Sequence, residues 1–149
     1  MLPIMKPVLC FSDVSKTNGA TATGAVDTYD TNTGIKYDFL QLNLIEATGD
    51  VVSNKPSVLK LSQSDTTDAT NYADISGFVG GTDFTVSNAN TSATTLTTFN
   101  VDLRGRKRYI KLTVSPRTTQ IVGAWGSLGR GHQAPNTATQ AGIKQLVEG

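Results

Sequence analysis

The chain has 149 residues, of which 38% are hydrophobic and 17% are charged, and its formal net charge is +1. This length fits one domain with a single core. A nearly neutral chain lacks the overall positive field that attracts nucleic acid, so we do not expect a nucleic acid as the partner. No apolar run approaches the roughly 20 residues that span a bilayer, and Met1 to Lys6 lack the pattern of a signal peptide. We therefore expect synthesis in a cytoplasm and no membrane partner.

A first strand is predicted at residues 8–11, where four apolar residues follow one another. Pro3 and Pro7 lie just before this run, and because proline donates no backbone hydrogen bond they favour an edge position or an extended lead-in over a central strand. The run contains Cys10, the only cysteine of the chain. A single cysteine excludes an internal disulfide and a multi-cysteine zinc site, so we interpret Cys10 as a small buried hydrophobic residue.

Short strands joined by polar turns continue along the chain. The clearest of this group covers residues 37–47, and because both of its faces carry apolar side chains we expect it in a central position or against a partner. Further strands are predicted at residues 25–31, 57–63, 72–75, 84–86 and 118–128. No amphipathic helix is predicted before Gly131. This pattern predicts an all-β fold, an antiparallel β-sandwich of the jelly-roll type.

Residues 97–115 predict a β-hairpin, the strongest structural signal in the chain. Apolar and polar residues alternate in both arms, as in half-buried strands. The apolar positions are Phe99, Val101 and Leu103 in the first arm and Ile110, Leu112 and Val114 in the second. Gly105 supplies the permissive backbone of the reversal.

Four cations surround this reversal: Arg104, Arg106, Lys107 and Arg108. Clustered arginines are good hydrogen-bond donors to a partner surface. Tyr109 is the only aromatic residue among them, which is less than a surface for nucleic acid offers. We therefore expect a docking contact with a partner protein, and the alternative is a solvated hairpin end.

The chain changes in character after residue 131, so we divide it into a β-sandwich domain (1–131) and a C-terminal arm (132–149). In the arm, Ile143, Leu146 and Val147 are at helical spacing, but a core helix would carry more apolar residues. We expect the arm to be extended or to form a short helix, and to dock on a neighbouring subunit through these three residues. A disordered tail is the alternative.

No catalytic constellation is recognisable. His132 is the only histidine and lies outside any nucleophile motif. The glycines at 77–81 lack the lysine and the serine or threonine of a phosphate-binding loop, and those at 123–129 lie where a strand is predicted. We interpret both sets as turns or bulges. We predict that the protein is not an enzyme and has no cofactor. A hydrolase with two carboxylates across a cleft remains an alternative that a sequence pattern does not reveal.

An acidic turn combines Asp65, Asp68, Asn71 and Asp74, whose oxygens are of the kind that hard cations prefer. Their spacing does not match a calcium-binding EF-hand loop. We interpret them as solvated turn residues that form local Asx turns, and we predict no metal.

Trp125 lies between Gly123 and Gly126. A glycine inside a strand usually marks a bulge or the close approach of another backbone. We interpret Trp125 as a core anchor, and the alternative is an interface or a platform for stacking on a sugar.

A further pattern joins four stretches: residues 99–115, Tyr37-Asp38-x-Leu40, Leu59-x-Leu61-x-x-Ser64-Asp65 and Ala134-Pro135-Asn136-Thr137. Together they resemble small structural proteins of tailed bacteriophages, namely capsid cement or decoration proteins. The resemblance implies a β-rich protein on the outer surface of the virion, commonly trimeric and without enzymatic activity.

On this resemblance we expect a cement protein that is made in the host cytoplasm, binds the outer surface of the head and bridges major capsid proteins as a homotrimer. The expected partner-binding residues are Arg104, Arg106, Lys107, Arg108, Ile143, Leu146 and Val147. The alternative is a carbohydrate-binding or host-attachment module of a virion, in which Trp125, Tyr72 or Tyr109 would stack on sugars.

Overall fold

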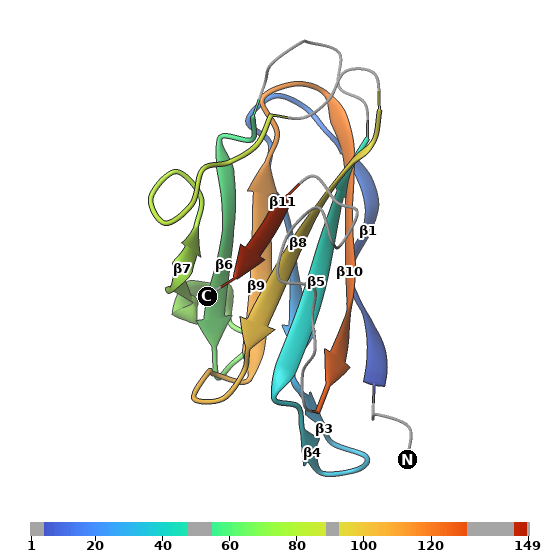
Figure 1. The fold of residues 1–149 in the computed structure, drawn as a ribbon, viewed down its shortest axis with the longest axis vertical. Helices are drawn as coiled ribbons and strands as arrows, with labels where there is room; N and C mark the ends of the chain where they lie inside the picture. Colours follow the sequence, from blue (N-terminus) through green and yellow to red (C-terminus); the bar gives the residue numbers. More distant parts are fainter. Residues whose placement is uncertain (1–4, 48–54, 89–92, 131–144, 149) are drawn as a thin grey trace.

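The computed structural model describes residues 5–47, 55–88, 93–130 and 145–148. Two sheets pack face to face, which confirms the predicted all-β sandwich (Figure 1). The five-stranded sheet contains β1 (Met5–Lys16), β10 (Gln120–Gly129), β5 (Phe39–Glu46), β8 (Thr95–Asp102) and β11 (Gln145–Glu148), in that order. The four-stranded sheet contains β2 (Ala22–Asp27), β9 (Tyr109–Ser115), β6 (Val58–Ser64) and β7 (Ala73–Val79), in that order.

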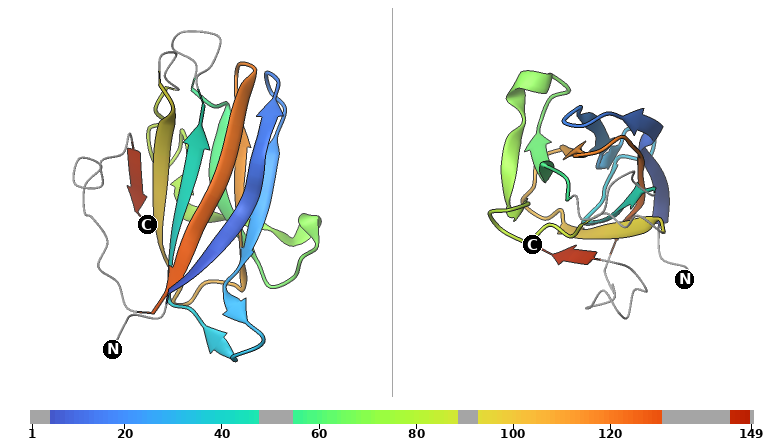
Figure 2. Two further views of the ribbon diagram at one scale, coloured as in Figure 1. Left: turned by 90° about the vertical axis from the view of Figure 1, so that its right-hand side faces the viewer. Right: turned by 90° about the horizontal axis from the view of Figure 1, so that it is seen from above.

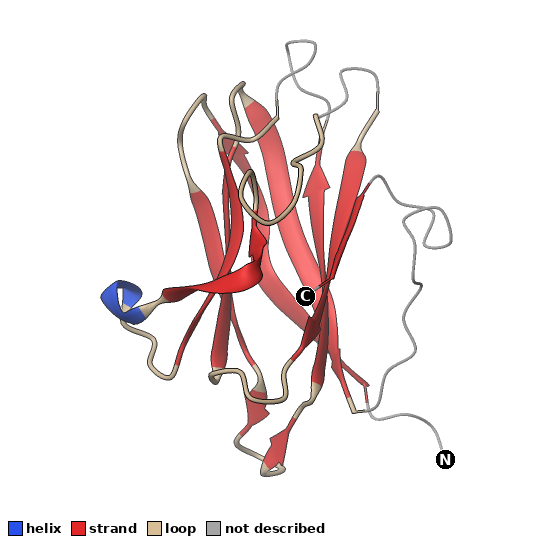
Figure 3. Cartoon of the chain, turned by 60° about the vertical axis from the view of Figure 1, so that its left-hand side comes forward, coloured by secondary structure: helices blue, strands red, loops and turns tan. Residues whose placement is uncertain are grey.

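Two small elements complete the described structure. The strands β3 (Tyr29–Asp30) and β4 (Ile35–Lys36) form a short ribbon at one end of the sandwich (Figure 1). A single 3-10 turn, η1 (Ala69–Asn71), lies between β6 and β7 and is the only helical element of the described residues (Figure 3). No described helix has the length and apolarity needed to cross a membrane.

The eight long strands other than β11 pair in a nested order. β1 pairs with β10, β2 with β9, β5 with β8 and β6 with β7, and all four pairings are antiparallel. The chain therefore forms one long folded ribbon whose successive pairs alternate between the two sheets. Numbered one to eight along the chain, these strands lie in the orders 1-8-3-6 and 2-7-4-5. This arrangement is the predicted jelly roll.

The predicted hairpin at residues 97–115 is wrong in its pairing. Its two arms, β8 and β9, lie in different sheets, because β8 pairs with β5 and β9 pairs with β2 and β6. The connection between them crosses from one sheet to the other at the lower end of the sandwich (Figure 1). The alternation of the arms is confirmed, since all six apolar positions are at most 1% exposed. The two apolar faces meet across the core instead of lying side by side.

The core is a layer of leucine, valine, isoleucine and phenylalanine side chains between the sheets. The view from above shows how the two sheets face each other (Figure 2). The predicted central strand at residues 37–47 is confirmed, because β5 lies between β10 and β8. The edge position of β1 is also confirmed. The strand predicted at residues 84–86 is wrong, since this segment has only an isolated bridge between Gly80 and Phe84. A well-formed loop replaces it.

Cys10 is buried, as predicted, and its thiol donates a hydrogen bond to the Gly24 carbonyl at 3.2 Å. Burial raises the pKa of this thiol to about 12. A side chain at Gly24 would overlap the Cys10 carbonyl oxygen, so β1 and β2 approach closely at this point. The thiol is therefore an inert packing group at physiological pH.

The end of the arm is extended. Residues 145–148 form β11, which pairs in parallel with β8 of the same chain, so the short helix is not found there. Val147 is 3% exposed and belongs to the core, while Leu146 is half-buried, which is the alternation of a strand. The Gln145 side chain accepts a hydrogen bond from the Ser87 amide and donates one to the Thr85 carbonyl. Ile143 lies outside the described residues.

One carboxyl group is buried near the upper end of the core. Glu46 is 3% exposed, and its neighbours in the sheet are Val122 and Thr95. Within the described part of the chain, Glu46 Oε2 and Thr95 Oγ1 have no hydrogen-bond partner. Because burial disfavours the ionised form, it raises the pKa of Glu46 from 4.5 to about 7.

We expect the free energy of unfolding to fall as the pH rises from about 4.5 to about 7. In this window the unfolded chain has already released the Glu46 proton while the folded chain still holds it, so a rise in pH favours unfolding. The difference between the two pKa values corresponds to roughly 3 kcal/mol. Glu46→Gln should remove this dependence and be the more stable protein near pH 8. Urea unfolding across this pH range checks it, and parallel profiles for the two proteins would contradict it.

Candidate interaction site

The outer faces of the two sheets differ in chemistry. The outward positions of the four-stranded sheet are polar and carry charges, among them Thr23, Asp27, Lys60, Ser62, Lys111 and Thr113. On the five-stranded sheet the outward positions of β5, β8 and β10 are mainly apolar or uncharged polar residues. Asn43 and Thr98 are buried there and hydrogen-bonded to each other, while Ile121 and Trp125 are exposed. Depletion of charge together with exposed aromatic surface is typical of the centre of a protein interface.

Four large hydrophobic side chains are exposed among the described residues, and all lie on β1 and β10. They are Met5 (59% exposed), Leu9 (65%), Ile121 (50%) and Trp125 (47%), and we call them the apolar surface. Leu9 and Trp125 are direct cross-strand neighbours. Ile121 shares the outward side of β10 with Trp125, since Val122 and Ala124 between them point into the core.

A carboxylate lies within the apolar surface. β1 contains a bulge at which Ser12 and Asp13 together face Gly123 of β10. A side chain at Gly123 would overlap Asp13 Oδ1, so the Asp13 carboxylate occupies the space above this glycine. Gly123 is the outward residue between Ile121 and Trp125, which places the acid between these two apolar side chains. A bulge that redirects a side chain in this way is a common device next to functional sites.

The loop between β8 and β9, residues 103–108, carries the four predicted cations, and we call it the basic loop. Its backbone is held in place on both sides: the Leu103 amide donates to the Asp38 carbonyl at 2.9 Å, and the Lys107 amide donates to Gln63 Oε1 at 3.1 Å. Gly105 has a φ of 76°, a conformation that favours glycine. Leu103 is anchored in the core at 1% exposure. The loop is therefore a defined support for its side chains.

Two of the four cations are engaged within the chain. Arg104 forms an ion pair with Asp102, and this contact raises the pKa of the Arg104 guanidinium. Arg108 binds Asp27 through Nε at 2.9 Å and Nη2 at 2.7 Å. Its hydrogen bonds lower the pKa of the Asp27 carboxyl and raise that of the guanidinium. Both groups stay charged across the physiological pH range, and the pair connects the loop to β2.

Arg108 also contacts two aromatic rings. Its guanidinium carbon lies 5.1 Å from the ring centres of both Tyr29 and Tyr109, within the range of a cation–π interaction. The Arg108 amide donates to Asp65 Oδ1 at 3.3 Å, and its carbonyl accepts from the Thr28 hydroxyl at 2.7 Å. Arg108 is therefore a structural residue of this end of the sandwich.

Arg106 and Lys107 are the remaining cations of the basic loop. Within the described residues, neither side chain forms an ion pair. Lys107 is exposed and Arg106 is half-buried. The two adjacent charges are available to a partner.

The aromatic candidates for sugar stacking lie on different faces. Trp125 is on the outer face of the five-stranded sheet, so its interpretation as a core anchor is wrong and the alternative of a surface platform fits its position. Tyr72 lies beside the other sheet, where Lys111 Nζ is 3.9 Å from its ring centre. Tyr109 contacts Arg108. One glycan therefore does not reach all three.

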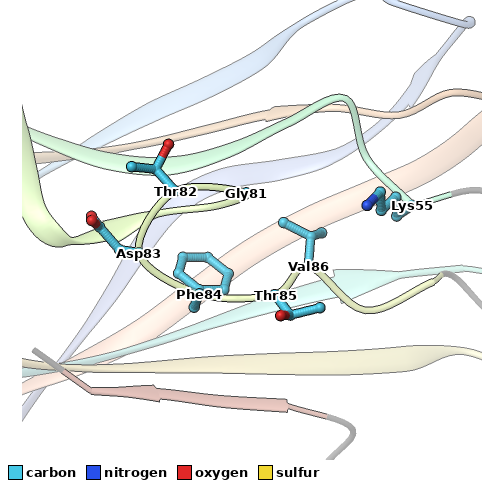
Figure 4. A pocket seen from close by; sticks show the side chains of 7 residues that line it. All are labelled: Lys55, Gly81, Thr82, Asp83, Phe84, Thr85 and Val86. Atoms are coloured by element: carbon cyan, nitrogen blue, oxygen red, sulfur yellow. The ribbon is translucent and has the colours of Figure 1, made fainter.

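An open pocket of about 280 Å³ lies beside the loop that follows β7 (Figure 4). Its lining includes Lys55, Asp83 and Phe84. Asp83 Oδ2 accepts hydrogen bonds from the amides of Gly77 and Val79 at 2.8 and 2.9 Å, so its charge holds the loop together.

The acidic turn forms the predicted Asx turn. Asp68 Oδ1 accepts hydrogen bonds from the backbone amide and the hydroxyl of Thr70. The hydrogen bond from the backbone amide lowers the pKa of the Asp68 carboxyl. Asp74 pairs with Lys60. Among the described residues no group of three acidic, histidine or cysteine side chains is placed to hold a metal ion. His132 lies outside the described residues.

Sequence reasoning missed Asp13 and the exposed positions of Leu9 and Ile121. The alternation within β10 contained a signal for Ile121, which shares its phase with Trp125. Asp13 has no such signal, because its position depends on a bulge in β1. Of the predicted residues, the structure brings the four cations together in one loop and places Val147 in the core.

No family model matches the chain, and no curated protein matches it either.

We expect Arg108 and Lys107 to respond differently to the same substitution. Arg108→Ser removes the bond to Asp27 and the contacts with two tyrosine rings, so it should lower the midpoint of thermal unfolding by a few degrees. Lys107→Ser should leave the midpoint unchanged, because its side chain forms no ion pair in the described structure. Thermal melts followed by circular dichroism check this. Equal midpoints for the two variants would remove Arg108 from its structural role.

Proposed function

We propose that this protein is a capsid cement protein of a tailed bacteriophage that binds the outer surface of the head and bridges major capsid proteins as a homotrimer. The observation that carries the proposal is the apolar surface. Leu9 and Trp125 lie side by side, and Met5 and Ile121 continue the same outer face further along the two strands, so apolar side chains are exposed over two neighbouring strands. They suit a protein that is stabilised by lying between other subunits.

The fold is consistent with this role. Jelly rolls are common in viral capsid proteins and in lectins, so this support is an analogy of fold and applies to two classes of function. The fixed basic loop adds an argument from the site itself. A preorganised loop loses little conformational entropy on binding, which favours affinity.

The proposal is tested with purified protein and with heads assembled from a candidate major capsid protein. Light scattering should give a mass near three times 15.8 kDa, and sedimentation with heads should show saturable binding. A protein that is monomeric at every concentration and absent from the sedimented heads would refute the proposal.

Attachment to heads should depend on the two available cations. We expect Arg106→Ser/Lys107→Ser to weaken attachment roughly tenfold at low salt, since exposed ion pairs contribute up to about 1 kcal/mol each. The difference should shrink as salt rises. Lys60→Ser/Lys111→Ser is the matched control, because it removes two positive charges from the outer face of the four-stranded sheet, outside the basic loop. Equal weakening by both variants would indicate a general charge effect and would exclude a specific loop contact.

A second candidate is a carbohydrate-binding or host-attachment module, and the exposure of Trp125 favours it. A glycan array with the wild type and Trp125→Ser separates the two functions. Binding of a glycan that the variant loses would support this candidate against the cement role.

A further inference from the structure

We propose that the basic loop of one copy binds the Asp13 carboxylate and the apolar surface of the next copy. The inference rests on the proposed homotrimer and assigns the basic loop and the apolar surface to the contact between copies. Loss of Arg106 and Lys107 would then weaken attachment to heads through loss of the trimer. The contact joins two different surfaces of the same chain, so it runs in one direction from each copy to the next.

The acceptor is the Asp13 carboxylate, which has apolar side chains on both sides. Asp13 lies above Gly123 and between Ile121 and Trp125, and Leu9 is the cross-strand neighbour of Trp125. Within the described residues Asp13 takes part in no ion pair. A cation that reaches it would gain an ion pair partly shielded from water and an aromatic ring beside it. The site therefore fits a protruding lysine or arginine.

The donor is the basic loop. Its neighbouring cations Arg104 and Arg108 are neutralised by Asp102 and Asp27, which leaves Arg106 and Lys107 as adjacent charges without an ion pair in the described structure. Backbone hydrogen bonds at the two ends of the loop, to Asp38 and to Gln63 of β6, hold the backbone from which these two side chains project. Charge and position complement those of the acceptor.

The two surfaces of one copy do not reach each other. The basic loop follows Asp102, which is level with Phe39 and Gly129 in the sheet. Gly123 lies six residues along β10 from Gly129, which is about 20 Å, and two strand spacings add about 10 Å across the sheet. This separation is far longer than a lysine or arginine side chain. Only a second copy brings the loop to Asp13.

A directional contact of this kind closes into a ring when the rotation between copies allows it. Each copy then supplies one loop and one acceptor, and no surface is left over. A closed ring of three copies agrees with the proposed homotrimer.

Charge reversal tests the contact in the purified full-length protein. Asp13→Lys alone, or Arg106→Glu/Lys107→Glu alone, places like charges against each other and should lower the mass from the oligomer to the monomer in light scattering. The triple variant restores opposite charges in every contact and should recover the oligomer. Trp125→Ser should weaken association at least about tenfold, because it removes a central aromatic contact.

Two matched controls carry the same changes in charge on the other sheet: Asp74→Lys, and Lys60→Glu/Lys111→Glu. Both should keep the wild-type mass, and circular dichroism confirms that each variant is folded. A monomeric wild type, or reversal variants that keep the oligomer, would overturn the inference, as would a triple variant that stays monomeric. Head binding is measured separately, so an oligomer that behaves as expected but ignores heads would refute only the cement function.

Discussion

The exclusion of water from the layer between the two sheets is the interaction on which the rest of the structure depends. Leucines from both sheets, including Leu42, Leu44, Leu61 and Leu112, are completely buried in this layer. Burial of one such side chain contributes about 1.5–3 kcal/mol, so the layer dominates stability. It also fixes the phase of every strand, because shifting a strand by one residue would move its leucines into water. The outward positions are thereby defined. Trp125 and Ile121 are exposed because Val122 and Ala124, which alternate with them along β10, are buried in the core.

Much of the fold was readable from the sequence, because alternation in the strands is a local property. The inward faces of β8 and β9 were predicted correctly from their period of two. Their pairing was not, since a turn flanked by two amphipathic strands looks the same whether it closes a hairpin or crosses between sheets. The difference depends on β2 and β5, which precede these strands by dozens of residues. Trp125 was misplaced for a related reason: β10 carries apolar residues on both faces, so its phase is hidden.

The candidate site shows the same division between local and distant information. Arg108 and Lys107 are adjacent and alike in charge, and the sequence gives no reason to separate them. Asp27, which binds Arg108, is 81 residues away in the chain and reaches it only through the pairing of β2 with β9. Asp13 reaches the space above Gly123 only because β1 contains a bulge. Charge can be counted from a sequence, but its availability to a partner depends on contacts made by the fold.

The nested pairing of the strands also determines the order in which strand pairs can form during synthesis. The partner of β1 is β10, and Lys6 pairs with Leu128. β1 therefore becomes part of a sheet only after nearly the whole chain has been synthesised. During synthesis the ribosome releases β1 long before that partner exists, and Leu9 remains without its cross-strand neighbour Trp125 for most of translation. Contacts between such distant residues make folding slow and leave apolar surface open to aggregation in the meantime. The innermost pair, β6 with β7, is completed first along the chain, and each later strand adds the next outer pair. Synthesis from one end thus builds this sandwich from its middle strands outward, and the first strand made is among the last to be fixed.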